Sequence, residues 1–368
     1  MKEKRESEMV RAEPPLVLGL QPSALVDHVA RVDWSLLRQI HGQHGGSIPV
    51  TVGELEDIVS KVKKHVLPFP ESDDDSVSTS PVETMAGGSV ANTIRGLSSA
   101  FGISTGIIGA CGDDDEGHLF VHNMKFNGVD LSRLRNQRGH TAQCVCLVDA
   151  SGNRTMRPCL SSAVKVHAEE LTKDDFKGSK WLVLRYTPLD LEVIQAAILL
   201  AKQEGLLVSL DLASFEMVRD FKQPLLKLLV SGNIDLCFAN EDEATELLRD
   251  EQDADPEAAV EFLAKYCQRA VVTLGPKGCI AKHGKEIVRV PAIGEEKACD
   301  ATGAGDLFAS GFMYGLIKGV SLEECCKVGA CSGGSVICSL GGEVTLKNRQ
   351  WMYKQMQIKG LRTPDTSK

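Results

Sequence analysis

The sequence has no long apolar run, and its charge balance is negative. No stretch reaches the roughly 18 consecutive apolar residues that a membrane-spanning helix needs, so we expect no membrane partner. Residues 1–8 are rich in charge and lack the apolar core of a secretory signal, so we expect a cytoplasmic protein. The formal net charge of -9 argues against a broad nucleic-acid-binding surface.

Paired metal-binding cysteines are also missing, although the chain contains 12 cysteines. It has no Cys-x-x-Cys pair of the kind that holds structural zinc. Many of the cysteines lie inside apolar stretches, where cysteine behaves as a small hydrophobic residue: Cys144, Cys146, Cys237, Cys279, Cys331 and Cys338. We therefore expect reduced thiols, as in cytosolic proteins, and no disulfide framework.

The chain has 368 residues, of which 43% are hydrophobic, enough for one large α/β domain with an appendage or for two domains. Short apolar runs predict buried strands that alternate with helical segments. The predicted strands cover residues 16–20, 105–109, 181–184, 206–210, 234–239 and 270–274, and the helices 52–66, 189–203, 241–249 and 256–267. This alternation indicates a parallel sheet with helices on both faces.

Two segments depart from the alternation. Residues 141–148 and 154–158 flank a turn-rich centre at 149–153, which predicts a hairpin. With a further predicted strand over residues 25–32, this hairpin could form a small sheet over the ligand crevice. That crevice is expected beyond the carboxyl ends of the parallel strands, where Asp211, Asn240 and Gly275 would face one another.

Residues 300–306 read Asp-Ala-Thr-Gly-Ala-Gly-Asp and lead into a stretch of small and apolar residues. A glycine-rich turn that runs into a helix directs free backbone N–H groups at one point, which attracts an anion. We predict that the amides of Ala304, Gly305 and Asp306 stabilise the charge on a transferred phosphoryl group. Asp306 is also the predicted base, which takes the proton of an acceptor hydroxyl. An anion site plus a base indicates a small-molecule kinase.

A second glycine motif is expected to bind the substrate. Gly87 and Gly88 permit close approach of the backbone to a ligand, and Asn92 offers a donor and an acceptor that suit a pair of sugar hydroxyls. The alternative is a plain turn that caps a helix over residues 90–100. Asp27 is a further candidate, because a carboxylate near the crevice could bind two hydroxyls; its alternative is a solvated loop aspartate.

Two more motifs are expected beside a nucleotide. Asn240 ends a predicted strand and precedes Glu-Asp-Glu, so Asn240 and Glu243 could position Mg²⁺ through water. The alternative is ordinary N-terminal helix chemistry, since carboxylates are favoured there. Thr273, Gly275 and Gly278 lie in a strand-to-turn segment that could wrap a nucleotide, although a hairpin turn explains the same pattern.

Together these motifs resemble the PfkB carbohydrate-kinase family, which has a ribokinase-like fold, over nearly the whole chain. The segment 300–306 is similar to the specific second signature of that family. The order of Asp27, the Ala-Gly-Gly-Ser at 86–89, the turn at 152–155 and the Asn-Glu-Asp-Glu-Ala at 240–244 looks most like the adenosine-kinase branch. Ala301 stands where the family usually has threonine, and Ser23 stands where the adenosine-kinase branch usually has asparagine.

The resemblance implies an α/β, three-layer fold whose mostly parallel sheet is flanked by helices, plus a small β-sheet lid. It implies a kinase domain over residues 14–355 with lid segments at about 22–34 and 137–160. The remaining parts would be flexible: an acidic loop at 68–82 and tails at 1–13 and 356–368. It also implies ATP and Mg²⁺ as cofactors, with a monovalent cation as an option. The substrate would be a small molecule, and the protein a monomer or a homodimer.

The family's residue roles carry over onto matching positions. Asp306 would be the catalytic base and Gly303 to Gly305 the anion hole. Residues implied to bind the sugar moiety are Asp27, Gly88 and Asn92. Residues implied to lie by ATP are Asn240, Thr273, Gly275 and Gly278, with Glu243 near Mg²⁺.

Three functions remain open on the sequence. The first is transfer of the γ-phosphate of ATP to the primary hydroxyl of a nucleoside, a purine ribonucleoside such as adenosine. The second is a kinase for a free sugar, ribose or fructose; only 5% of the residues are aromatic, and none can be placed in a base-binding slot from sequence. The third is an inactive scaffold or regulator, which the presence of Gly303, Gly305 and Asp306 disfavours.

Overall fold

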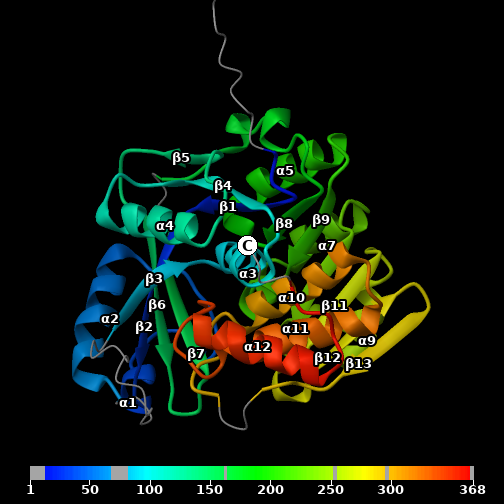
Figure 1. Ribbon diagram of the computed structural model, residues 1–368. Helices are drawn as coiled ribbons and strands as arrows, with labels where there is room; N and C mark the ends of the chain where they lie inside the picture. Colours follow the sequence, from blue (N-terminus) through cyan, green and yellow to red (C-terminus); the bar gives the residue numbers. More distant parts are fainter. Residues whose placement is uncertain (1–12, 68–81, 161–163, 252–254, 295–297, 365–368) are drawn as a thin grey trace, which may run out of the picture.

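The computed structural model describes residues 13–67, 82–160, 164–251, 255–294 and 298–364. It contains a nine-stranded sheet and a separate four-stranded sheet, which lie side by side in Figure 1. The predicted α/β class with a small second sheet is therefore confirmed. None of the helices within these ranges is long and apolar enough to cross a bilayer.

The large sheet is parallel except for two strands at one edge. In spatial order it comprises β13 (Glu286–Val290), β12 (Cys279–His283), β11 (Arg269–Thr273), β10 (Leu236–Asn240), β9 (Leu207–Asp211), β8 (Trp181–Arg185), β1 (Val17–Ser23), β4 (Thr105–Cys111) and β5 (Leu134–Asn136). From β5 to β11 all neighbours pair in parallel, whereas β12 and β13 turn back as antiparallel hairpins. The parallel strands therefore deliver their carboxyl ends to one edge, where ligands bind in such sheets.

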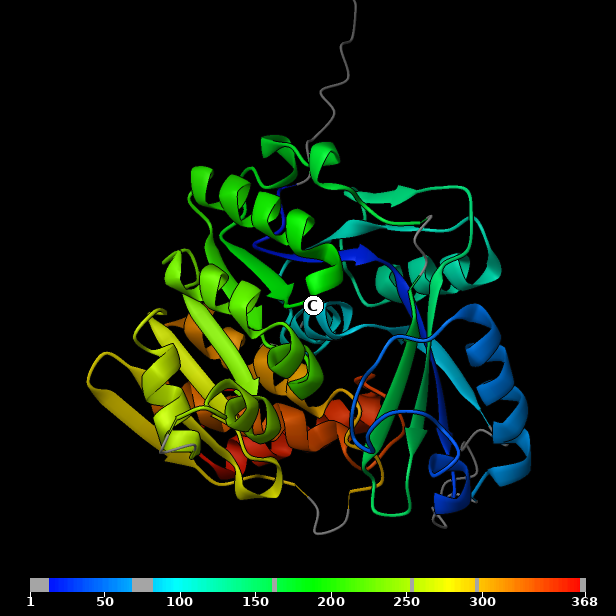
Figure 2. The ribbon, with the colours of Figure 1, turned by 180° about the vertical axis from the view of Figure 1, so that it is seen from behind.

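Helices cover both faces of this sheet and bury two apolar clusters. One face carries α3 (Ser89–Phe101), α4 (Asp115–Phe126), α10 (Ala304–Lys318), α11 (Leu322–Val336) and α12 (Leu346–Ile358). The other, seen from in front in Figure 2, carries α5 (Leu191–Gln203), α6 (Phe215–Asp220), α7 (Lys222–Val230), α8 (Glu241–Leu247) and α9 (Pro256–Leu263). Adjacent residues of a strand, such as Val17 and Leu18, pack into the clusters on opposite faces of the sheet, because successive strand side chains point to opposite sides.

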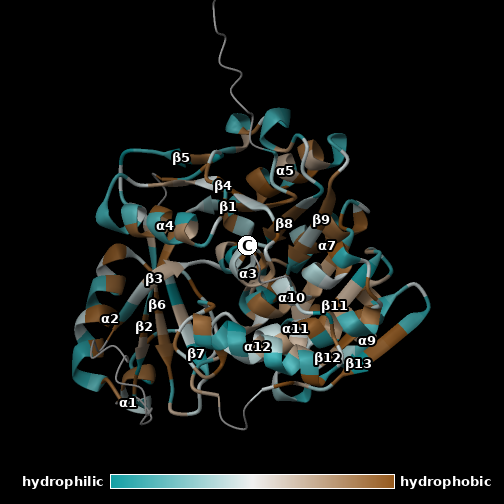
Figure 3. Ribbon diagram, viewed as in Figure 1, coloured by the Kyte–Doolittle hydropathy of each residue, from teal (hydrophilic) through white to brown (hydrophobic). Residues whose placement is uncertain are grey.

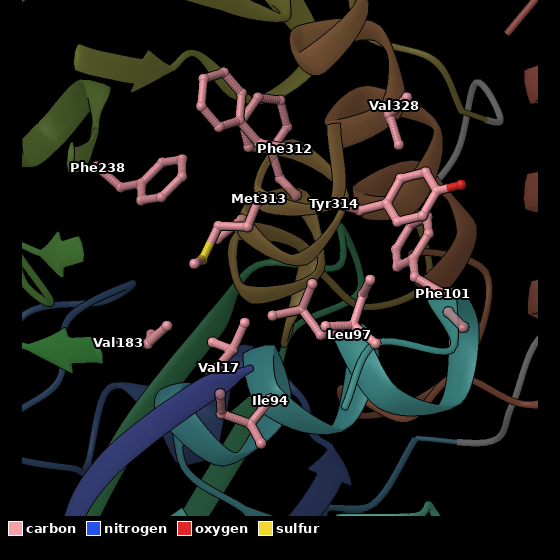
Figure 4. Packing of buried hydrophobic residues seen from close by; sticks show 14 of the residues in the cluster. Val17, Ile94, Leu97, Phe101, Val183, Phe238, Phe312, Met313, Tyr314 and Val328 are labelled. Carbon is pink, nitrogen blue, oxygen red and sulfur yellow. The ribbon is translucent and has the colours of Figure 1, made fainter. Parts of the chain in front are cut away.

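Helix α10, which carries the predicted base, is fixed at the centre of this packing. The Phe312 ring packs edge to face against Phe238 of β10, Met313 joins the same apolar cluster as Ile94 of α3, and Tyr314 stacks on Phe101 (Figure 4). Helix α12 lies outermost and is mainly hydrophilic on its visible face (Figure 3). The first residues of α10 are therefore held on a buried, rigid element, which suits a site that must keep its geometry.

The small sheet has the order β3 (Glu83–Gly87), β2 (Leu25–Arg31), β6 (Ala142–Val148) and β7 (Arg154–Cys159). The hairpin predicted around residues 149–153 is confirmed as the antiparallel pair β6–β7, and the predicted strand at 25–32 pairs in parallel with β6. Its outer face packs against α1 (Trp34–Leu37) and α2 (Val52–His65). Its inner face presents a second set of apolar residues.

Two features differ from the sequence expectations. Strand β3 was not predicted: residues 83–87 pair with β2, and only this tertiary pairing stabilises so short a segment. The flexible tail was expected from residue 356, but Met356 and Leu361 are 0% and 8% exposed because they complete the apolar cluster under α12. The acidic segment 68–81 lies outside the described residues.

Candidate active site

Asp306 lies in the first turn of α10 and lines a pocket with Ser89, Asp211 and Phe238. Both of its carboxylate oxygens accept hydrogen bonds. The Ser89 hydroxyl donates to Oδ1, and the Asn92 amide donates to Oδ2 at 2.9 Å. The predicted base is therefore oriented by fixed partners, and its side chain is only partly buried.

Asn92 is in turn held by a buried arginine. The Arg95 guanidinium donates to Asn92 Oδ1 at 2.7 Å, so Asn92 must point its NH₂ group at Asp306. Arg95 is only 1% exposed; it also donates to Asn123 Oδ1 at 2.7 Å and to Glu343 Oε1 at 3.2 Å. The structure thus gives Asn92, predicted to bind sugar hydroxyls, a direct contact with Asp306, the predicted base, as well.

The turn before α10 has the form expected of an anion site. Gly303 is the N-cap at φ 76°, and the first intrahelical bond joins the Leu307 N–H to the Gly303 carbonyl at 2.8 Å. The amides of Gly305 and Asp306 precede that bond, so they point out of the helix end. The Ala304 N–H, also predicted to hold the anion, instead donates to the Ala301 carbonyl at 3.2 Å.

Asp300 holds this turn in place by accepting hydrogen bonds from two backbone amides. Its carboxylate accepts from the Thr302 amide at 2.7 Å and from the Gly341 amide at 2.8 Å, and the side chain is fully buried. Burial raises its pKa, and hydrogen bonds to Thr302 limit the rise. The Ala301 N–H donates to the Gly152 carbonyl at 3.0 Å, so the tip of the β6–β7 hairpin lies against the predicted anion site.

Asp27 lies within β2 on the inner face of the small sheet, not in a solvated loop. It is 3% exposed, and a Cβ added to Gly87 would meet its carboxyl carbon at 2.1 Å. Burial raises the pKa of Asp27 to about 7, the positive charge of Arg95 opposes that rise, and the negative charge of Asp306 adds to it. The backbone amide of Gly88, at φ 95°, limits the rise in the pKa of Asp27. The predicted sugar-binding residues Asp27, Gly87 and Gly88 are therefore in contact.

The carboxyl ends of β8, β9 and β10 bring a second group of charges together. Arg185 and Asp211 are register partners, and Asn240 ends the next strand. Asn240 and Glu243 form a reciprocal cap on α8: the Glu243 amide donates to Asn240 Oδ1 at 2.9 Å, and the Asn240 amide donates to Glu243 Oε2 at 2.8 Å. The structural alternative for this pair is thus observed, while the Mg²⁺ role stays a prediction.

Glu243 is buried beside another carboxylate. Burial, and then the negative charge of Asp211, raise the pKa of Glu243 to about 8. Burial raises the pKa of Asp211 to about 6, opposed by the positive charge of Arg185. Two acidic groups that resist ionisation side by side are suited to share a cation, which would favour the charged form of both.

This geometry predicts a pH dependence of stability. The pKa of Glu243 is about 8 in the folded protein against its ordinary 4.5, so the folded state binds more protons between these values. Its contribution is therefore fully present below about pH 4.5 and is lost as the pH rises through about 8. We expect Glu243→Gln, which retains the capping pattern, to make the free energy of unfolding less dependent on pH over that window in denaturant titrations.

The matched control is Glu324→Gln in the exposed capping box of α11, where hydrogen bonds to Ser321 lower the pKa of the carboxyl. This substitution should leave the decline toward pH 8 unchanged. An equally steep decline in Glu243→Gln would contradict the assignment of the titration to Glu243.

The predicted nucleotide residues lie at the same edge of the large sheet. Thr273 is the register partner of Asn240, and Gly275 lies two residues beyond the end of β11. Gly278, at φ 101°, closes a hairpin to β12, and a Cβ there would meet the Val290 carbonyl oxygen at 2.0 Å. The hairpin turn is thus observed, and contact of these residues with ATP stays a prediction.

Sequence reasoning missed two residues that orient the predicted base, Ser89 and Arg95, and one charged neighbour of Asp211, Arg185. Arg95 follows Asn92 by one helical turn, a spacing that places the two on one helix face. That spacing was the available signal for Arg95. Glu343 gave no such signal, because it reaches Arg95 from a segment far along the chain.

This arrangement is a ribokinase-like α/β fold, and solved structures share that fold. An adenosine kinase from Sinorhizobium meliloti is 29% identical, with a TM-score of 0.80 and coverage of 92% of this chain and 99% of that chain. A probable sugar kinase from Rhizobium etli is 26% identical with the same TM-score of 0.80, covering 95% of this chain and 99% of the other.

The chain belongs to the PfkB family: the family described as pfkB family carbohydrate kinase matches residues 50–349. Curated relatives include Adenosine kinase 2 of Arabidopsis thaliana, 27% identical over 73% of this chain and 82% of the relative. A 5-dehydro-2-deoxygluconokinase of Bacillus licheniformis is 28% identical over 68% and 80%, respectively. The protein is therefore a kinase of the sugar and nucleoside kinase family, and this membership implies ATP as the phosphoryl donor.

Proposed function

We propose that the protein transfers the γ-phosphate of ATP to the primary hydroxyl of a nucleoside. The observation that carries the proposal is the position of Asp306 at the amide-bearing end of α10, in a pocket beside Ser89 and Asp211. Asp306 takes the proton of the acceptor hydroxyl, and the Gly305 and Asp306 amides stabilise the charge that develops on the transferred group.

The inner face of the small sheet favours a nucleoside over a free sugar. Beside Asp27 it presents Met85 and Met156, and Leu340 packs against the same apolar cluster. A nucleobase needs an apolar slot, whereas a free sugar is held mostly by polar groups. Methionine adapts its shape to flat rings and makes favourable sulfur–aromatic contacts, which compensates for the scarcity of aromatic residues.

The choice of acceptor is tested by supplying ATP and Mg²⁺ with a panel of purine and pyrimidine ribonucleosides, ribose and fructose. We expect turnover of at least one ribonucleoside, with adenosine the first candidate. Turnover of ribose or fructose without any nucleoside would overturn the nucleoside proposal and support the sugar-kinase alternative, which the sugar-kinase relatives keep open.

Asp27 is proposed to bind acceptor hydroxyls in its ionised form. Each charge-assisted hydrogen bond contributes about 1.5–3 kcal/mol, so Asp27→Asn should raise the KM for the acceptor by about tenfold to 100-fold, with a smaller effect on the KM for ATP. Because the pKa of Asp27 is about 7, kcat/KM for the acceptor should rise as the pH passes through that value.

The measurement is a pH profile of kcat/KM for the acceptor in the wild type and in Asp27→Asn. Asp57→Asn, at an exposed position of helix α2, serves as the control. The Asp27→Asn variant should lose the rise near pH 7, whereas the control should keep it. An unchanged acceptor KM in Asp27→Asn would remove this residue from the substrate site.

Mg²⁺ is proposed to bind between the nucleotide phosphates and the acidic edge formed by Asp211, Asn240 and Glu243. Mg²⁺ keeps several of its waters when bound, so it can be held through those waters by only a few side chains. The buried Asp211–Glu243 pair supplies the negative charge that fits such a cation. ATP would lie along Thr273, Gly275 and Gly278, with its terminal phosphate at Gly303 to Gly305.

A further inference from the structure

Two thiols and one carboxylate gather on the inner face of the small sheet. Asp27, Cys144 and Cys146 are all buried, and one ligand atom from each lies within 4.8 Å of the others. The sulfur atoms of Cys144 and Cys146 are 3.8 Å apart. None of the steps proposed above uses either thiol.

Strand pairing places the three groups together. Asp27 of β2 is the direct register partner of Cys144 of β6, and paired strands lie about 4.8 Å apart. Cys146 follows Cys144 by two positions, so both side chains point to the same face of the sheet. The intervening Val145 packs on the opposite side, under α2.

The spacing of the two thiols fits a bridging cation. Two thiolates at about 2.3 Å from a tetrahedral zinc ion lie roughly 3.8 Å from each other. A disulfide fits less well, because positions i and i+2 of an extended strand have Cα atoms about 6.6 Å apart, near the upper limit of about 6.8 Å for a disulfide. The pair is therefore arranged for metal ligation without movement of the strand.

The carboxylate supplies a second observation that points to a ligand. Among the described residues, Asp27 Oδ1 has no hydrogen-bond partner, although the side chain is 3% exposed. A buried polar oxygen without a partner costs free energy, and a bound cation would satisfy it. The partly buried apolar side chains of Met85 and Met156 pack against the same cluster and lower the local polarity, which strengthens such an interaction.

We propose that Asp27, Cys144 and Cys146 form a binding site for a thiophilic divalent cation of the Zn²⁺ type, and that the bound cation blocks the acceptor site. Each thiol releases one proton to solvent as its sulfur–metal bond forms, and one carboxylate oxygen completes a three-residue set with a fourth position for water. The blocking effect rests on the proposed role of Asp27 in substrate binding; the metal site itself does not.

Cobalt(II) titration of the full-length reduced protein tests the metal site directly, since thiolate ligation of tetrahedral Co²⁺ produces intense charge-transfer and visible bands. We expect these bands in the wild type, their displacement by Zn²⁺, and their loss in the double variant Cys144→Ser with Cys146→Ser. Cys338→Ser, at an exposed thiol, and Cys267→Ser, at a buried one outside the cluster, should retain them.

Asp27→Asn provides a second variant with both thiols intact; it should weaken Co²⁺ binding and alter the spectrum. Absence of the bands in the wild type, or their persistence in the double cysteine variant, would overturn the site. In the activity arm, buffered free Zn²⁺ should raise the acceptor KM of the wild type but not of the double cysteine variant. Tetrahedral Co²⁺ binding with no effect of Zn²⁺ on that KM would retain the metal site and reject the role of Asp27 in acceptor binding.

Discussion

Asp306→Asn is expected to lower kcat by about 10²- to 10⁴-fold, the usual contribution of a positioned general base. The side chain keeps its size, so Ser89 can still donate to its oxygen, but the amide cannot accept the proton of the acceptor hydroxyl. Binding of ATP should be retained, because the backbone amides of the turn are unchanged. Steady-state kinetics with titration of an ATP analogue separate the two effects.

The control for this prediction is Asp250→Asn, which removes a carboxylate that is 78% exposed and paired with Lys222 at the surface. That variant should show wild-type kinetics and nearly wild-type stability. A wild-type kcat in Asp306→Asn would mean that the base is assigned wrongly.

Gly303 and Gly305, the two glycines of the turn before α10, should differ in how substitution by alanine affects folding and activity. A Cβ at Gly305 meets nothing within 4 Å, so Gly305→Ala should fold normally, gaining up to about 1 kcal/mol of helix propensity. The methyl group would intrude into the open space where the phosphate is proposed to lie. We expect kcat to fall by about 10²- to 10³-fold, as for loss of an anion-stabilising donor.

Gly303→Ala should instead destabilise the fold. Gly303 has φ 76°, and its added Cβ would lie 2.4 Å from Gly342 Cα. The backbone conformation alone costs about 1–2 kcal/mol, and overpacking adds about 1–3 kcal/mol. Gly319→Ala separates the two terms, because Gly319 has φ 69° with open space around it. Denaturant titration should therefore give a lower free energy of unfolding for Gly303→Ala than for Gly319→Ala. An equal loss of stability in the two variants would contradict a steric contribution at Gly303.

The large sheet could be predicted because its signals are local. Each parallel strand is a short apolar run followed by a helix, and burial on both faces makes such runs continuous. The strand ends at Asp211 and Asn240 followed from that pattern, and the register of β9 to β11 places them at one edge as expected. The glycine turn before α10 was equally visible, since glycine at positive φ has few other uses there.

The site itself was predictable only in part. The sequence marks Asp27, Asn92 and Asp306 as separate candidates, but it does not show that Asn92 contacts Asp306 and is itself oriented by Arg95. That connection joins α3 to α10 across more than two hundred residues, and no local pattern encodes it. Strand β3 was missed for the same reason, since its stability comes from pairing with β2.

The sequence by itself determined the α/β class and the glycine turn before α10, and it marked Asp306 as the proposed base, because strand burial, glycine conformations and helix ends are set by neighbouring residues. Only the tertiary structure decided the surroundings of Asp27: the pairing of β2 with β6 buries its carboxylate against Cys144, and Gly87 packs on it from β3. Charges and ligand sets of this kind depend on distances between remote segments, and those distances exist only once both sheets have formed.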